Sequence, residues 1–70
     1  MAQYCVNKNE QTNGDHEVHN LDVGCPHVPA PTNRIPLGNH AGCRTAVDKA
    51  KEYYRQSNGC YYCATACHTS

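Results

Sequence analysis

The chain has 70 residues, with six basic and six acidic side chains that cancel, and it contains only eight Ile, Leu or Val residues and neither Phe nor Trp. A core this small rarely contributes more than about 3–5 kcal/mol to the free energy of unfolding, so a single domain of this length usually relies on a disulfide, a metal or a partner. The balanced charge argues against sequence-independent nucleic-acid binding, which depends on a positive field. Six Cys and five His are the side chains available to hold such a domain together.

The expected compartment decides how the cysteines are interpreted. The N-terminal residues lack the basic start and apolar run of a secretory signal, and no segment approaches the ~20 apolar residues of a membrane span. We therefore expect a cytoplasmic chain, in which clustered cysteines are more often metal ligands than disulfides. If the chain is exported, a disulfide framework is the expectation instead.

Three short strands are expected in the first half of the chain. Residues 4–7 form a short candidate strand, and turn-forming residues follow over 8–15. The second strand, residues 17–21, places Val18 and Leu21 near the core. A stiff connector with three prolines leads to residues 34–38, where the internal Pro36 favours an edge strand.

The clearest expected element is a helix over residues 39–56. Asn39 is a suitable N-cap, and apolar residues recur at helical spacing from Cys43 to Tyr54. The Ser-Asn-Gly sequence at 57–59 then ends the helix. Short strands plus one helix in the C-terminal half predict an α+β fold with two or three antiparallel strands.

The strongest local pattern is Cys60-Tyr61-Tyr62-Cys63, preceded by Gly59. Two thiols three positions apart can point at one ion from a tight turn, which the glycine makes possible. A redox dithiol has the same spacing, but there the pair begins a helix that follows a strand. Here the pair follows the expected helix, so the pattern favours zinc, and a four-coordinate site needs two further N or S ligands.

Cys25 is the preferred third ligand, because a Gly-Cys-Pro turn presents its thiol and a shared ion would close a long loop. His19, six residues earlier on an expected strand, is the preferred fourth ligand. The sequence thus predicts one structural Zn²⁺ with four ligands: His19, Cys25, Cys60 and Cys63.

The fourth ligand has competitors. Cys43 stands in the first turn of the expected helix, although its place on the apolar stripe also suits a buried core thiol. Cys67 and His68 are further candidates, with a free thiol in a frayed chain end as the plainer interpretation. Cys5 is interpreted as a half-buried strand residue.

Several features occur in a familiar order within residues 17–63: His19 in a strand, Cys25 in a turn, Asn33-Arg34-Ile35, a helix with Ala46 and Ala50, and a closing Gly59-Cys60-Tyr61-Tyr62-Cys63. This order resembles the small bacterial zinc modules related to the N-terminal metal-binding domain of the Ada DNA-repair protein. The resemblance implies a fold and a bound metal. In the Ada domain four cysteines bind zinc and one accepts a methyl group from a DNA phosphotriester, whereas this set has three cysteines and a histidine, and a basic surface is lacking. Methyl transfer is therefore not carried over. The chain is also similar to stand-alone bacterial proteins of about this length with a Cys-Tyr-Tyr-Cys and Cys-His-Thr ending.

These observations predict one domain over residues 1–70, with an N-terminal strand and loop (1–16), a zinc-module core (17–63) and a tail (64–70). The expected function is a zinc-stabilised binding module for a protein or small-ligand partner, not for nucleic acid or a membrane. The alternatives are a thiolate-dependent enzyme, acting as an alkyl acceptor or in thiol redox chemistry, and a protein for metal handling or sensing. An enzyme is the less favoured class, because no Ser-His-Asp or paired-carboxylate arrangement is apparent.

Overall fold

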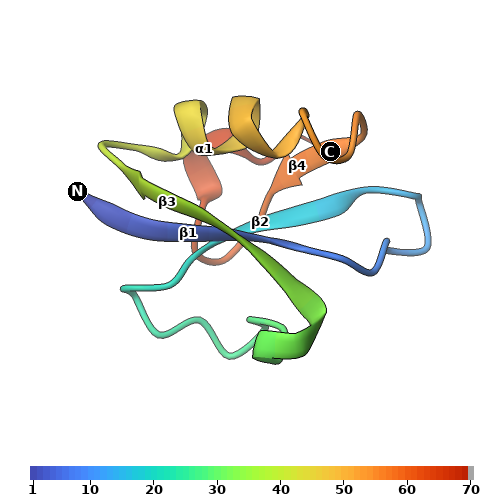
Figure 1. Cartoon of the computed structure of the whole chain (residues 1–70), viewed down its shortest axis with the longest axis horizontal. Coiled ribbons are helices and arrows are strands. Elements are labelled where there is room, and N and C mark those ends of the chain that lie inside the picture. The colour runs from blue at the N-terminus through green and yellow to red at the C-terminus, as the bar shows by residue number, and fades with distance from the viewer. Residues whose placement is uncertain (70) are drawn as a thin grey trace.

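A four-stranded mixed sheet in the order β3-β1-β2-β4 carries one helix in the computed structural model, which describes residues 1–69 (Figure 1). Strand β1 pairs antiparallel with β2 and with β3, whereas β2 and β4 run parallel. The α+β class is confirmed, but the expectation of two or three antiparallel strands is wrong. The elements are β1 (Ala2–Asn7), β2 (His16–Asn20), the 3₁₀ turn η1 (Pro31–Asn33), β3 (Arg34–His40), α1 (Cys43–Ala50), β4 (Ser57–Gly59) and the 3₁₀ turn η2 (Thr65–Cys67).

Strand β4 is the element that the sequence did not predict. Its three residues are typical of turns, yet they pair along β2, and the last of them, Gly59, lies opposite Val18. The buried Asn58 side chain donates to the Asp15 carboxylate at 3.3 Å, and its Oδ1 accepts the Thr69 backbone N–H at 2.9 Å. Hydrogen bonds to distant residues, rather than intrinsic strand preference, therefore hold this strand in place.

Helix α1 is shorter than the 39–56 helix expected from the sequence. Strand β3 continues to His40 because β1 pairs with it as far as Ala2, so Asn39 is a strand residue and Gly42 takes the N-cap position. Residues 51–53 continue as turns after the helix. Within residues 1–69, no helix combines the length and apolar character that crossing a membrane requires. The pairing of β3 with β1 thus overrides the local helical pattern, and α1 begins later than that pattern predicts.

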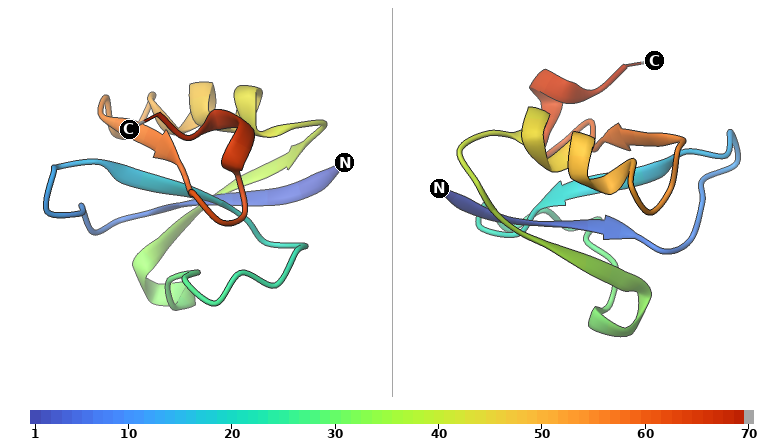
Figure 2. Two further views of the ribbon diagram at one scale, coloured as in Figure 1. Left: turned by 180° about the vertical axis from the view of Figure 1, so that it is seen from behind. Right: turned by 45° about the horizontal axis from the view of Figure 1, so that its top comes forward.

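The sheet has two differently covered faces (Figures 1 and 2). Helix α1 and the C-terminal segment lie over one face, and the connector over residues 21–33 lies below the other. The predicted core position of Val18 is confirmed, whereas Leu21 is half-buried in the turn after β2. Since successive strand residues face opposite sides, His19 points away from α1. The buried core comprises Tyr4, Val6, Val18, Leu37, Ala46, Val47 and Ala50.

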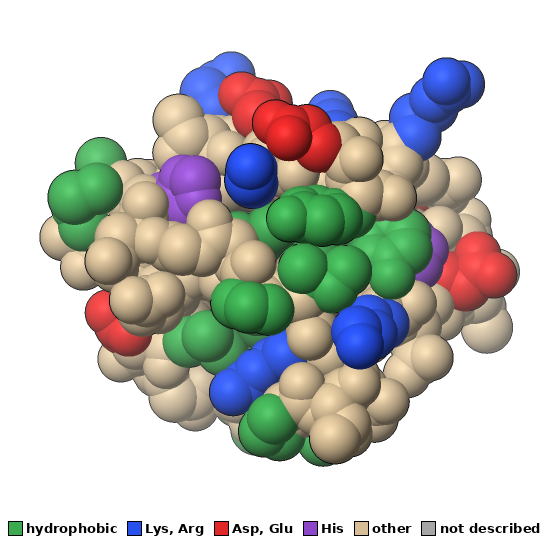
Figure 3. Space-filling view, viewed as in Figure 1, with side chains coloured by type: hydrophobic (Ala, Val, Ile, Leu, Met, Phe, Trp, Pro, Cys, Tyr) green, Lys and Arg blue, Asp and Glu red, His purple; other side chains and the backbone are tan. Residues whose placement is uncertain are grey.

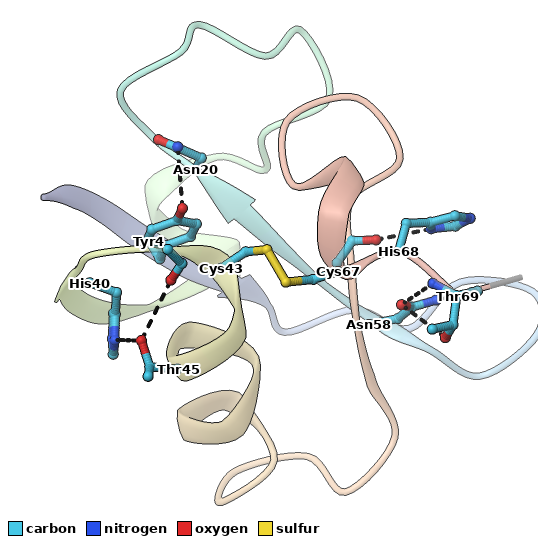
Figure 4. Close-up of a disulfide and its surroundings, with 11 residues drawn as sticks. Tyr4, Asn20, His40, Cys43, Thr45, Asn58, Cys67, His68 and Thr69 are labelled. Atoms are coloured by element: carbon cyan, nitrogen blue, oxygen red, sulfur yellow. Dashed lines mark hydrogen bonds between the residues drawn. A yellow bond between two sulfur atoms is a disulfide. The ribbon is translucent and has the colours of Figure 1, made fainter.

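A disulfide between Cys43 and Cys67 joins the start of α1 to η2 (Figure 4). The interpretations of Cys43 as a buried core thiol and of Cys67 as a free thiol in a frayed end are therefore wrong. The chain beyond Cys67 is also held, because His68 Nδ1 lies 3.0 Å from the Gly59 carbonyl oxygen. Ser70, the last residue of the predicted tail, lies outside the described residues.

Candidate metal centre

Three separate segments bring four possible metal-ligating side chains together. His19 comes from β2, Cys25 from the connector, and Cys60 and Cys63 from the turn that follows β4. The Cys60 backbone N–H donates to the Val18 carbonyl oxygen at 2.9 Å, which extends the β2–β4 pairing and fixes the start of that turn beside His19. One ligand atom from each of the four residues lies within 4.8 Å of the others. The structure therefore gathers the same four residues that the sequence indicated.

The spacing of the ligand atoms fits a tetrahedral zinc ion. Zn–S bonds of about 2.3 Å and Zn–N bonds of about 2.05 Å imply S···S and S···N separations of about 3.8 and 3.5 Å. The sulfur atoms of Cys25 and Cys60 are 3.9 Å apart, and Cys63 Sγ lies 3.5 Å from His19 Nδ1. An ion between these atoms would need little rearrangement of the side chains.

Each of the three sulfur atoms accepts a hydrogen bond from a backbone N–H group. Such bonds favour the thiolate form, because a charged acceptor gains more from a donor than a neutral thiol does. They also fix the direction in which each sulfur points. The bonds run from Asn20 to Cys63 at 3.3 Å, from His27 to Cys25 at 3.4 Å and from Tyr62 to Cys60 at 3.4 Å.

The second nitrogen of His19 supports a role for this residue as a ligand. The side chain is fully buried, and its Nε2 has no hydrogen-bond partner among the described residues. The nearest carboxylate oxygen, Oε1 of Glu17, is 3.6 Å away. If Nδ1 bound an ion, Nε2 would carry the proton and face the Glu17 carboxylate. A carboxylate commonly occupies this position beside a metal-binding histidine. Burial lowers the pKa of His19, which favours the neutral ring that a ligand requires.

The sulfur cluster needs a positive charge if it is to ionise. Burial raises the pKa of Cys63 to about 12; the Asn20 N–H lowers it, and the neighbouring Cys60 and Cys25 raise it. Three thiolates this close together, without a cation, would repel one another in a poorly solvated site. The donor set therefore fits a divalent ion better than it fits reactive free thiolates.

The remaining cysteines and His68 lie outside the cluster. Cys43 and Cys67 are consumed by the disulfide, and the ring of His68 bonds to a backbone carbonyl, so the structure does not bring them to the cluster. Cys5 is a strand residue as expected, but it is fully buried rather than half-buried. It lies opposite His19 in the β1–β2 pairing and outside the group of four within the described chain. Burial raises the pKa of the Cys5 thiol, while the charge of Arg34 and the His19 backbone N–H lower it. Nothing in the cysteine spacing signalled the disulfide.

Comparisons with protein-family models, with curated proteins and with solved structures found no match to this chain. The resemblance to the Ada domain therefore stays a prediction. The geometry of the four clustered side chains is the basis on which function is inferred.

Proposed function

We propose that this chain is a small zinc-binding protein in which one Zn²⁺, held by His19, Cys25, Cys60 and Cys63, is structural. The convergence of four ligand atoms from three segments, at tetrahedral spacing, is the observation that carries the proposal. A set of three sulfurs and one imidazole suits zinc, whereas calcium and magnesium prefer oxygen. Four protein ligands leave no open position for a substrate or a water molecule, which distinguishes structural from catalytic sites.

The proposed ion stabilises a fold whose apolar core is small. It joins β2, the connector and the turn after β4, whereas the Cys43–Cys67 disulfide joins α1 to η2, neither of which is one of these three segments. Because the unfolded chain does not hold the ligands together, most of the binding free energy becomes free energy of folding. Removal of the ion is therefore expected to loosen the connector and the ligand turn together.

We further propose that the turn from Cys60 to Cys63, which carries two of the proposed zinc ligands (the ligand turn), is also an interaction surface. Tyr61 and Tyr62 are 59% and 65% exposed, although they lie between two of the proposed ligands. The Tyr62 ring lies 4.5 Å from the ring of His27, and the Tyr61 ring lies 5.4 Å from that of His68. Exposed aromatic side chains on a rigid support are typical of binding surfaces. The partner is proposed to be a protein or a small ligand.

The distribution of charge supports the exclusion of nucleic acid from this proposal. Basic and acidic side chains cancel over the whole chain, and they lie interspersed around hydrophobic side chains on the face shown in Figure 3. Kinship with the Ada module remains part of the proposal, supported by the order of the motifs and without methyl transfer. A cytoplasmic location stays a prediction, and the Cys43–Cys67 disulfide is more typical of an oxidising compartment.

Two matched substitutions test the structural zinc site. Cys60 and Cys5 are both fully buried thiols, but only Cys60 is a proposed ligand. Cys60→Ser and Cys5→Ser should each lower the stability of the metal-free protein by about 1–3 kcal/mol, because each buries a hydroxyl group. Only Cys60→Ser should also lose stoichiometric zinc and the stabilisation that zinc gives.

Zinc per chain is measured by mass spectrometry on protein purified without chelators, and stability by urea unfolding with and without added zinc. We expect one zinc in the wild type and in Cys5→Ser, and a fall in affinity of about 100-fold or more in Cys60→Ser. A wild-type protein that takes up no zinc, or a Cys60→Ser variant with unchanged affinity, would overturn the proposal.

A further inference from the structure

The Cys43–Cys67 disulfide borders a surface cavity of about 200 Å³ between α1 and η2. Cys67 is half-buried and forms part of the cavity wall, whereas Cys43 lies outside the lining. Both cysteines are half-buried, but only Cys67 is in contact with a molecule that enters the cavity. The lining consists of Arg44, Val47, Asp48, Lys51, Ala66, Cys67 and Thr69.

The charge around the cavity favours the binding of small anionic molecules. Arg44 and Lys51 contribute two positive charges against the single carboxylate of Asp48, and all three side chains are exposed. A local excess of one sign raises the concentration of oppositely charged small molecules at a surface. The whole chain has no net charge, so this preference belongs to the cavity rather than to the protein.

The other sulfur atom is well placed to leave. Cys43 is the first residue of α1, whose N-cap, Gly42, provides no side-chain cap, and the first turn holds no acidic residue in the described chain. The backbone N–H groups of a first helical turn are unpaired and carry partial positive charge, which stabilises a nearby thiolate. Displacement at Cys67 therefore places the departing negative charge where the backbone favours it.

From the cavity-lining Cys67, the basic residues beside it and the position of Cys43 at the start of α1, we propose that Cys43–Cys67 is a thiol-exchange site for small anionic thiols. The incoming thiol loses its proton to solvent, and its sulfur forms a bond with Cys67 Sγ. The Cys43–Cys67 bond breaks, and its electron pair leaves with Cys43 as a thiolate. The incoming sulfur is oxidised and Cys43 is reduced. A second thiolate then attacks the incoming sulfur, releasing a small-molecule disulfide and reduced Cys67.

Glutathione, an anionic thiol, is the probe, with cationic cysteamine as its comparator. The protein is used as purified, with its metal content measured, and the reaction is trapped with acid and located by peptide mass mapping. We expect the first adduct on Cys67, and a rate constant per thiolate about 3–10-fold higher for glutathione than for cysteamine. Added salt should reduce this preference.

The double variant Arg44→Gln/Lys51→Gln should lose the preference for glutathione. Lys49→Gln is the matched control, because Lys49 is an exposed α1 residue outside the lining. Three results would overturn the proposal: a first adduct on Cys43, equal rates for the two thiols in the wild type, or reaction of the disulfide only after unfolding in urea. The thiol comparison on the wild type decides the matter even if the double variant folds poorly.

Discussion

Gly59 joins β4 to the ligand turn, and a methyl group at this position has no room. A Cβ atom built there would lie 2.7 Å from the Ala64 carbonyl oxygen, 2.8 Å from the Cys67 carbonyl carbon and 2.9 Å from Cys67 Cβ. The first two contacts are with backbone atoms, so no side-chain rotation relieves them. Gly59→Ala therefore forces β4 and η2 apart.

The size of the effect follows from these distances. Opening the closest contact to about 3.4 Å needs a displacement of roughly 0.7 Å between two packed segments. Overpacking of this kind costs about 1–3 kcal/mol. The strain also reaches the proposed metal centre, because Cys60 is the next residue and metal–ligand distances tolerate only about ±0.2 Å. We expect a loss of about 2–3 kcal/mol in the metal-free protein and at least a tenfold loss of zinc affinity.

Gly42→Ala is the control for Gly59→Ala. No atom lies within 4 Å of a Cβ built on Gly42, and its φ of −158° is extended backbone that any residue adopts. As an N-cap change it should cost no more than about 1 kcal/mol. Urea unfolding gives the stabilities, and competition with a chromophoric chelator gives the zinc affinities. If Gly59→Ala matched Gly42→Ala in both measurements, the reasoning from the packing around Gly59 would be refuted.

Three further outcomes are expected. Glu17→Gln should weaken zinc binding about 10–100-fold by removing the carboxylate that faces His19 Nε2, as measured by chelator competition; unchanged affinity would exclude Glu17 as an outer partner. Val18→Ala should lower the free energy of urea unfolding by about 2–3 kcal/mol, since it empties space in a fully buried position; a loss below 1 kcal/mol would contradict the packing described. Zinc binding at neutral pH should release protons, because the pKa of Cys63 is raised to about 12 without an ion; calorimetry in buffers of different ionisation enthalpy measures the number, and none released would show thiols already ionised.

The grouping of His19, Cys25, Cys60 and Cys63 could be predicted from sequence because the way in which short motifs present metal-ligating side chains is local. A Cys-x-x-Cys turn after a glycine and a thiol in a Gly-Cys-Pro turn present sulfur atoms whatever the surrounding fold. The preference for His19 over Cys43 as fourth ligand depended on a strand assignment, and β2 places His19 on the face turned toward the connector.

The features that the sequence did not predict, namely β4, the late start of α1 and the disulfide, depend on contacts between residues distant in the sequence. Strand β4 forms because Asn58 is bonded to Asp15 and Thr69, and neither contact is visible in a three-residue turn sequence. Helix α1 starts late because β1 pairs with residues that a local pattern assigns to the helix. The Cys43–Cys67 disulfide likewise depends on how η2 packs on α1, which no cysteine spacing encodes.

The disulfide and the proposed ion hold neighbouring parts of the chain after β4: the ion holds the turn that contains Cys60 and Cys63, and the disulfide holds η2 at Cys67. Cys43 and Cys67 are separated by 24 residues, and closing a loop of this size contributes about 3.5 kcal/mol in the chain-entropy model. That value is comparable to everything expected from so small a core. The backbone of Cys67 packs on Gly59, which precedes the first ligand of the turn, so the disulfide limits how far the turn can move when the ion is absent. Opening the disulfide would remove this limit, and the position of Cys60 and Cys63 would then depend more strongly on the ion itself.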